Sequence, residues 1–328
     1  MSTTWASGAN GQLSIIREDT YGTTPTLVAD STNVYVVPFN TCDITMSQPP
    51  QTPATITGTR SASKPFRGNK DVTGSVIVPI DDKAIGLWLK LLFNNPTTTG
   101  TSPNYNHVFT IPVTLPSYSI EKGFTDIADY YKYTGCKASN FSVTYGGGGE
   151  LTMNVGLQGA NESHAETSMR AAGEKEIDWA SVTSRLYNNQ GTVSIGGETI
   201  CVTEFNINMD NTLENAYCIN DQGAKSKCVG GQTVVTGSFT GVFENDTFLA
   251  LGRADTETAL SLTVTDGIFT LTFNFDETVL STSSPGITGP TGVYQTLDFT
   301  AYYEDDADAT SMKVTLINDV ALYDDYTF

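Results

Sequence analysis

Histidine is nearly absent from this 328-residue chain: only His107 and His164 occur, and no motif places either of them beside a nucleophile. Hydrolases of the Ser-His-Asp or Cys-His type need a histidine held next to the serine or cysteine. No apolar run approaches the ~20 residues that a membrane-spanning helix requires. The first 13 residues also lack the basic-then-apolar order of a signal peptide. We therefore expect a soluble, non-enzymatic protein without membrane insertion that folds in a reducing cytoplasm.

Basic residues are also scarce, since 17 Lys and Arg stand against 36 Asp and Glu and give a net charge of −19. DNA-binding proteins gain affinity when their basic side chains displace counterions from phosphates, so this chain is not expected to grip a duplex. The acidic excess is uneven. Residues 1–173 carry 11 basic and 13 acidic side chains, whereas residues 174–328 carry 6 and 23. We interpret the excess either as a solubilising surface or as one that keeps an anionic molecule from adhering.

Neither the cysteines nor the acidic residues form a pattern typical of a metal site. The number of cysteines is odd, no pair has C-x₂-C spacing, and they are Cys42, Cys136, Cys201, Cys218 and Cys228. Cys218 and Cys228 flank a polar loop and are expected to remain thiols. The acidic run at residues 304–308 lacks the glycine and distal glutamate of an EF-hand, so we interpret it as a solvated hairpin tip. We expect no catalytic residue, no cofactor and no metal ligand.

Hydrophobic residues alternate with Thr, Ser and Asn over several segments of the chain. The clearest are residues 141–145, 151–157, 260–265 and 269–275. This period of two is typical of strands with one buried face, and it predicts a mostly β fold with antiparallel sheets packed as a sandwich or barrel. Four glycines at residues 146–149 are followed by a strand pattern, so they indicate a hairpin turn instead of a phosphate-binding loop.

One segment has helical spacing instead. Its apolar residues, which would pack on the β body, are Ile85, Trp88, Leu89 and Leu92. Asp81 or Asp82 can cap the first turn, and Asn-Asn-Pro at residues 94–96 ends the pattern. The spacing predicts a single amphipathic helix over residues 84–93.

The chain repeats itself. Two pairs of segments share an offset of 163 residues, namely 43–48 with 206–211 and 72–76 with 235–239. A third pair, 117–120 with 261–264, has an offset of 144. The difference of 19 residues indicates an insertion in the first copy, within residues 94–115. We expect two tandem copies of one β-sandwich or barrel unit, each flanked by one short helix, that join near residues 174–186 and span residues 1–175 and 176–328.

Long loops stand at corresponding positions of the two copies, at residues 48–71 and 211–234. They hold six of the 17 basic residues: Arg60, Lys64, Arg67 and Lys70 in the first loop, and Lys225 and Lys227 in the second. The first loop has no acidic residue before Asp71. The loops are either ordinary exposed segments or arms that dock on the acidic surface of another copy, which would make assembly depend on salt.

The order of several motifs resembles that of the tail tube proteins of long, non-contractile-tailed bacteriophages, the siphovirus type. The similar segments are residues 13–23, Arg67-Gly68 before residues 72–75, the helix at 84–93, residues 115–123, 131–137 and 205–214. The similarity extends over nearly the whole chain and is weakest at residues 211–231 and 309–328. Together these motifs carry the resemblance, because each one alone is short.

The resemblance implies a structural virion protein of the tail. Such proteins stack as rings into a hollow tube, in which six copies of the domain surround the lumen and their inner strands form one barrel. With two copies in a chain, we expect a trimeric ring with pseudo-sixfold symmetry, and a six-chain ring is the alternative. The implied partners are the protein itself, a tape measure protein, a tail-tip or baseplate initiator and a tail terminator. Double-stranded DNA would pass through an acidic lumen without specific binding, and assembly would take place in the cytoplasm of the bacterial host.

Two other classes of function remain open from the residues alone. A virion decoration module, or one that binds a receptor or a carbohydrate, shares the β-sandwich fold and favours exposed Trp and Tyr, whereas this chain has three Trp. A hydrolase would need a pocket with perturbed carboxylates, and no pair of acidic residues stands out.

Overall fold

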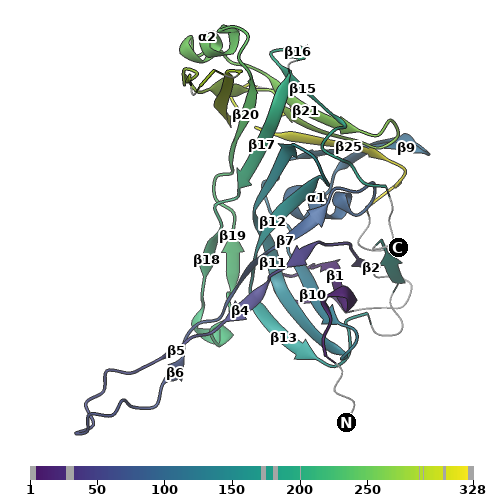
Figure 1. Cartoon of the computed structure of the whole chain (residues 1–328). Coiled ribbons are helices and arrows are strands. Elements are labelled where there is room, and N and C mark those ends of the chain that lie inside the picture. Colours follow the sequence, from purple (N-terminus) through teal and green to yellow (C-terminus); the bar gives the residue numbers. More distant parts are fainter. Residues whose placement is uncertain are drawn as a thin grey trace.

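The computed structural model describes residues 5–26, 33–170, 175–179, 184–199, 201–287, 289–290, 292–305 and 308–323. This part of the chain is built from strands, with two α-helices, so the prediction of a mostly β fold is confirmed (Figure 1). The strand order of each sheet has two open ends, so none of the described sheets closes into a barrel. None of the helices in the described residues is long and apolar enough to span a membrane.

An antiparallel sheet, here called the central sheet, runs through the length of the molecule in the order β4–β7–β12–β11–β17–β20–β24–β23 (Figure 1). Its strands are β4 (Thr45–Ser47), β7 (Asp71–Pro79), β12 (Thr152–Gly159), β11 (Asp129–Gly146), β17 (Val202–Asp210), β20 (Val234–Val242), β24 (Tyr294–Ala301) and β23 (Thr278–Leu280). The short strand β3 (Thr41–Cys42) also pairs with β7. The four-glycine segment connects β11 with β12 as the predicted hairpin turn.

The first half of β11 belongs to a second set of strands. It pairs with β10 (Tyr118–Phe124) on one side and with β13 (Asn161–Ala165) on the other. From β10 the pairing continues to β1 (Gly11–Arg17), β2 (Asn33–Val36) and β14 (Lys175–Asp178). A register shift between Ala138 and Asn140 separates the two halves of β11, and such bulges bend a strand. The expected join at residues 174–186 includes β14, while residues 174 and 180–183 lie outside the described part.

A seven-stranded outer sheet covers the other side of the central sheet. Its order is β16 (Glu198–Thr199), β15 (Gly191–Ile195), β21 (Leu260–Thr265), β22 (Thr270–Phe275), β25 (Lys313–Asn318), β9 (Asn104–Thr110) and β8 (Thr97–Thr101). The predicted insertion at residues 94–115 is therefore the hairpin β8–β9, and β9 pairs with β25 from the end of the chain. This long-range pairing fastens the first half of the chain to the second.

Aromatic side chains fill the space between the two sheets. The ring centroid of Phe141 in β11 lies 6.4 Å from that of Phe273 in β22, and Phe275 lies 5.2 Å from Phe299 of β24. The strands alternate buried with partly exposed residues, as in the pattern of β22, because successive side chains point to opposite faces of a sheet. One hydrophobic cluster extends from Leu13 to Tyr323, so both halves share a core.

The predicted helix is α1 (Ile85–Phe93), and Asp81 caps it by accepting hydrogen bonds from the backbone N–H groups of Lys83 and Ile85. The four predicted packing residues, Ile85, Trp88, Leu89 and Leu92, are fully buried. The helix is nevertheless not amphipathic in its setting, because all nine of its residues are buried. Lys90 is 2% exposed, and its ammonium group donates a hydrogen bond to the backbone oxygen of Tyr323. The C-terminal segment covers the side that the sequence pattern assigns to solvent.

The second helix, α2 (Thr247–Arg253), begins where the repeat offset places it, and it lies at one end of the molecule (Figure 1). Two short strand pairs complete the fold: β5 (Pro50–Gln51) with β6 (Phe66–Arg67), and β18 (Glu214–Ala216) with β19 (Lys227–Val229). Single 3₁₀ turns occur at η1 (Gly8–Asn10) and η2 (Ile219–Asp221).

Two local expectations are wrong. His107, expected in a loop, lies in β9 and is fully buried, and His164 lies in β13. The acidic run at residues 304–308 connects β24 of the central sheet with β25 of the outer sheet, so it is not a hairpin tip. Residues 306–307 of this run lie outside the described part.

Candidate functional site

One face of the central sheet is polar, and we call it the polar face. In β17 the residues Phe205, Ile207 and Met209 point into the core, so the residues between them point away from it. Across the pairs of β11, β17, β20 and β24 the outward residues stand opposite one another: Asn140, Ser142, Asn206, Asn208, Thr236, Ser238 and Thr300. Hydroxyl and amide side chains therefore dominate this face.

The charge of the polar face is acidic where it is charged. Glu204, Asp210 and Asp298 are exposed at outward positions of β17 and β24. The strands β7, β12, β17, β20 and β24 contain neither lysine nor arginine. A shallow groove of about 470 Å³ follows this face over Asn140, Asn208 and Thr236. Such a surface offers no cation for a phosphate.

The central sheet ends in two open edges. β4 and β3 pair only with β7, and β23 pairs only with β24, among the described residues. An open edge presents backbone N–H and C=O groups that can pair with another strand. Between these edges β11 and β17 pair along seven positions, from Asn140 with Asp210 to Gly146 with Glu204.

The first long loop is an arm that leaves the body of the molecule (Figure 1). Its base is the pair β5–β6, and residues 52–65 extend beyond that base. Arg60 and Lys64 have exposed and half-buried side chains, respectively, and Ile56 is 96% exposed. Arg67 stays at the base, where its guanidinium donates a hydrogen bond of 2.9 Å to the backbone oxygen of Gln48.

The second long loop folds against its own chain instead. Lys225 is buried, and its Nζ lies 2.6 Å from the carboxylate of Asp71 and 3.3 Å from the backbone oxygen of Val72. Lys70 Nζ donates to the side-chain oxygen of Asn161. Lys227 is exposed on β19. Of the six candidate contact residues, Lys70 and Lys225 thus bind within the chain, whereas Arg60 and Lys227 face solvent.

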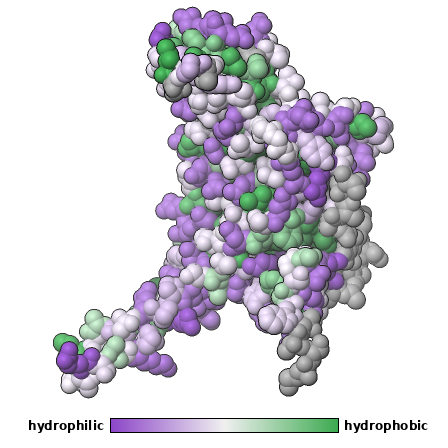
Figure 2. All heavy atoms as spheres, viewed as in Figure 1, coloured by the Kyte–Doolittle hydropathy of each residue, from purple (hydrophilic) through white to green (hydrophobic). Residues whose placement is uncertain are grey.

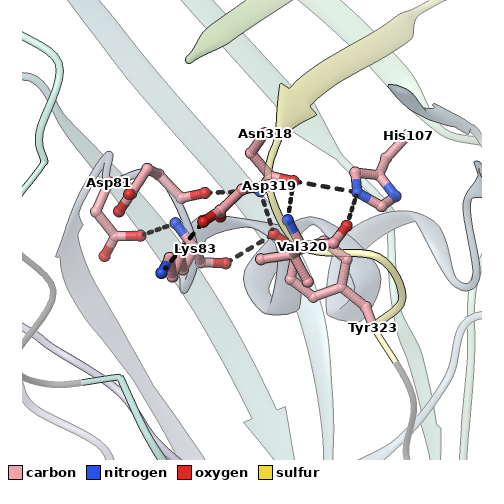
Figure 3. Close-up of polar contacts among 8 residues, drawn as sticks. Asp81, Lys83, His107, Asn318, Asp319, Val320 and Tyr323 are labelled. Atoms are coloured by element: carbon pink, nitrogen blue, oxygen red, sulfur yellow. Dashed lines mark hydrogen bonds and ion pairs between the residues drawn. The ribbon is translucent and has the colours of Figure 1, made fainter. Parts of the chain in front are cut away.

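A polar network joins the start of α1 to the end of the chain (Figure 3). The hydroxyl of Tyr323 donates to the backbone oxygen of Lys83 at 2.9 Å and accepts from the amide of Asn318 at 2.6 Å. His107 Nε2 lies 2.9 Å from the backbone oxygen of Val320. Burial lowers the pKa of His107, which favours the neutral ring. This network is structural, because its groups bind one another.

Burial also raises the pKa of Asp81 to about 6, although the two backbone N–H groups that it caps act in the opposite direction. Within the described residues no group of three or more His, Cys, Asp or Glu side chains is placed to hold a metal ion. All five cysteines are free thiols, including the exposed Cys218 and the buried Cys228.

Reasoning from the sequence did not single out the polar face. Its signal is present, since Thr, Ser and Asn occupy every second position of β17, β20 and β24, but this pattern alone does not say that the strands share one sheet. The pairing of β11 with β17 brings the two halves of the face together.

The fold is that of a mostly β protein with a polar, base-free sheet face and two open sheet edges. Residues 8–301 match the family model described as phage tail tube protein, and the chain belongs to this family. The match ends before the C-terminal segment, where the motif resemblance is also weakest. No curated protein matches the chain. It is thus a structural component of a phage tail.

Proposed function

We propose that three chains form a ring with pseudo-sixfold symmetry, that rings stack into the tube of a siphovirus-type tail, and that the polar face lines the lumen. The observation that carries this proposal is the pairing of β11 with β17. It joins two strand sets with the same internal order, since β7 pairs with β4 and β12 just as β20 pairs with β17 and β24. We take each set as one copy of a tube domain.

The register indicates which edges would meet between chains. Val235 pairs with Ala301, and the corresponding Val72 pairs with Gly159, so β24 follows β12 by 142 residues. Gly156 pairs with Asn140, which corresponds to Asp298 beside residue 281. The backbone N–H of Ser281 donates to the oxygen of Asp298, in agreement with this offset.

Ring closure then repeats the contact that exists within the chain. Asn140 lies opposite Asp210. Ser281 corresponds to Asn140, and Ser47 corresponds to Asp210 through the offset of 163 residues. We therefore expect Ser281 of one chain to lie opposite Ser47 of the next. Residues 281–287 are without strand pairing in the single chain, and this contact would extend β23 through them.

The chemistry of the polar face suits a channel for DNA. A duplex that moves through a narrow tube must not be held, and a wall without lysine or arginine makes no phosphate contacts that release counterions. Hydroxyl and amide groups keep the wall hydrated. The role is structural, and DNA passes without specific binding.

The other partners follow from this role. The tube would grow in the cytoplasm of the bacterial host, from a tail-tip or baseplate initiator, around a tape measure protein, and would end at a tail terminator. Arg60, Lys64 and Arg67 on the arm, and Lys227 on β19, are the basic residues that we propose for contacts between rings. Lys70 and Lys225 support the arm and the β18–β19 hairpin from within the chain.

A crosslinking experiment counts the chains in the ring. The double variant S47C/S281C, in a background with the exposed Cys201 and Cys218 replaced by serine, is treated with a short bismaleimide. A closed ring of three gives covalent species up to three times 35.2 kDa and none larger. Each single variant gives monomers. Species up to six chains would establish the six-chain ring.

Electron microscopy of the same samples tests the tube itself. We expect rings or hollow fibres with three- or sixfold end views. Monomers that persist with the tail-tip initiator present would overturn the tube, and binding to a glycan array would then support the receptor- or carbohydrate-binding module.

A further inference from the structure

An apolar groove lies beside α2, at the end of the molecule opposite the arm (Figure 1). We call it the α2 groove. Its volume is about 410 Å³, and it is bounded by α2, the β15–β16 hairpin and the strands β20 and β24. Apolar side chains line its interior: Phe239, Phe248, Leu251 and Leu297. Phe239 and Phe248 meet edge to face with centroids 6.2 Å apart.

The rim of the α2 groove is acidic. Glu198 and Glu244 both line it and are exposed. Asp246 caps the region at the start of α2, and Arg253 is at the far end of that helix. An apolar interior with carboxylates at its border fits an apolar side chain that is flanked by basic residues.

The arm has this composition. Ile56 is 96% exposed, more than any large apolar side chain should be without a partner nearby, and Arg60 and Lys64 follow it within eight residues. Residues 48–70 contain no aspartate or glutamate. Figure 2 shows hydrophobic atoms both at the far end of the arm and around α2. The two surfaces lie too far apart in Figure 1 to meet within one chain.

We propose that the α2 groove of one chain receives the arm of another copy in the adjacent ring, with Ile56 in the groove and Arg60 and Lys64 beside Glu198 and Glu244. The proposal rests on the proposed function, because stacked rings bring the arm end of one chain to the α2 end of another. Burial of one isoleucine side chain contributes about 1.5–3 kcal/mol, and repetition around a ring multiplies that contribution.

The native Cys201 provides the test, because it lines the α2 groove and is exposed. The variant I56C, in a background with Cys218 replaced by serine, is assembled into tubes and treated with a short bismaleimide. The introduced thiol should crosslink to Cys201 of another chain, which peptide mass spectrometry identifies. Replacing Cys201 by serine in the same variant should abolish the product.

The matched control is I268C, which places the thiol at another exposed isoleucine, 76% accessible in the turn between β21 and β22. Because stacking holds the arm in the groove at a high effective concentration, we expect I56C to crosslink at least about tenfold more than I268C. Tubes in which I56C and I268C crosslink equally, or in which I56C reacts elsewhere, would overturn the groove as the receptor while leaving the tube intact. Absence of tubes in the unmodified protein would instead overturn the proposed function, and this inference with it.

Discussion

Phe141 of β11 lies opposite Met209 of β17, and both side chains are buried in the shared core. This pair is the midpoint of the contact that makes one sheet of the two halves of the chain. On the other face the neighbouring positions, Ser142 and Asn208, are polar. One pairing therefore closes the core and builds the polar face at the same time.

The polar face should tolerate charge without loss of folding but not without loss of function. The double variant N208K/T236K adds two lysines at outward positions of β17 and β20. If this face lines the lumen, the tubes should still form, while DNA release from reconstituted phage should slow and become dependent on salt, because lysines bind phosphates. Fluorescence of released DNA measures the rate.

The matched control for that variant is T192K, on an exposed position of the outer-sheet strand β15. It should leave release unchanged. Equal effects of the two variants would place the DNA elsewhere.

Neutralising the arm should stop the stacking of rings. We expect R60Q/K64Q to remain as single rings at salt concentrations where the unmodified protein forms tubes, since both residues lie on an arm without acidic residues. The charge-conserving variant R60K/K64R should form tubes. Electron microscopy across a salt series distinguishes rings from tubes, and normal tubes from R60Q/K64Q would contradict the role of these charges.

The C-terminal segment should stabilise the whole chain through Tyr323. Y323F removes the hydroxyl that donates to Lys83 and accepts from Asn318. Leaving those buried groups unpaired should lower the free energy of unfolding by about 1–3 kcal/mol, as measured by urea denaturation. The exposed Tyr187, changed to phenylalanine, is the control and should have no effect. Equal unfolding free energies for Y323F and the unmodified protein would show that the hydroxyl contributes nothing.

Asp81 should make the protein less stable as the pH rises from about 4 to about 6. Its folded pKa of about 6 lies above the ordinary value of 3.8, because burial disfavours the ionised form. The unfolded chain therefore loses the proton first, and the folded state loses up to about 3 kcal/mol across this interval before the effect levels off above the folded pKa.

The variant D81N isolates that contribution, because asparagine can still accept the capping hydrogen bonds without ionising. Urea denaturation between pH 4 and pH 8 should show that the free energies of unfolding of D81N and the unmodified protein diverge up to about pH 6 and then run parallel. Curves that are parallel throughout would show that Asp81 ionises freely in the folded protein.

The sequence by itself determined the mostly β fold, the two helices, the glycine hairpin and the tail tube family. These features depend on local patterns: alternation along a strand, a capped run of apolar residues, and motifs kept in order. The tertiary structure decided the rest. It enclosed Lys90, which the helical pattern assigns to solvent, because the C-terminal segment returns over α1. It buried Lys225 against Asp71 while leaving the arm extended, although both loops look alike in charge. It also placed β11 beside β17. Such contacts join residues far apart in the chain, and no local pattern states which edges meet.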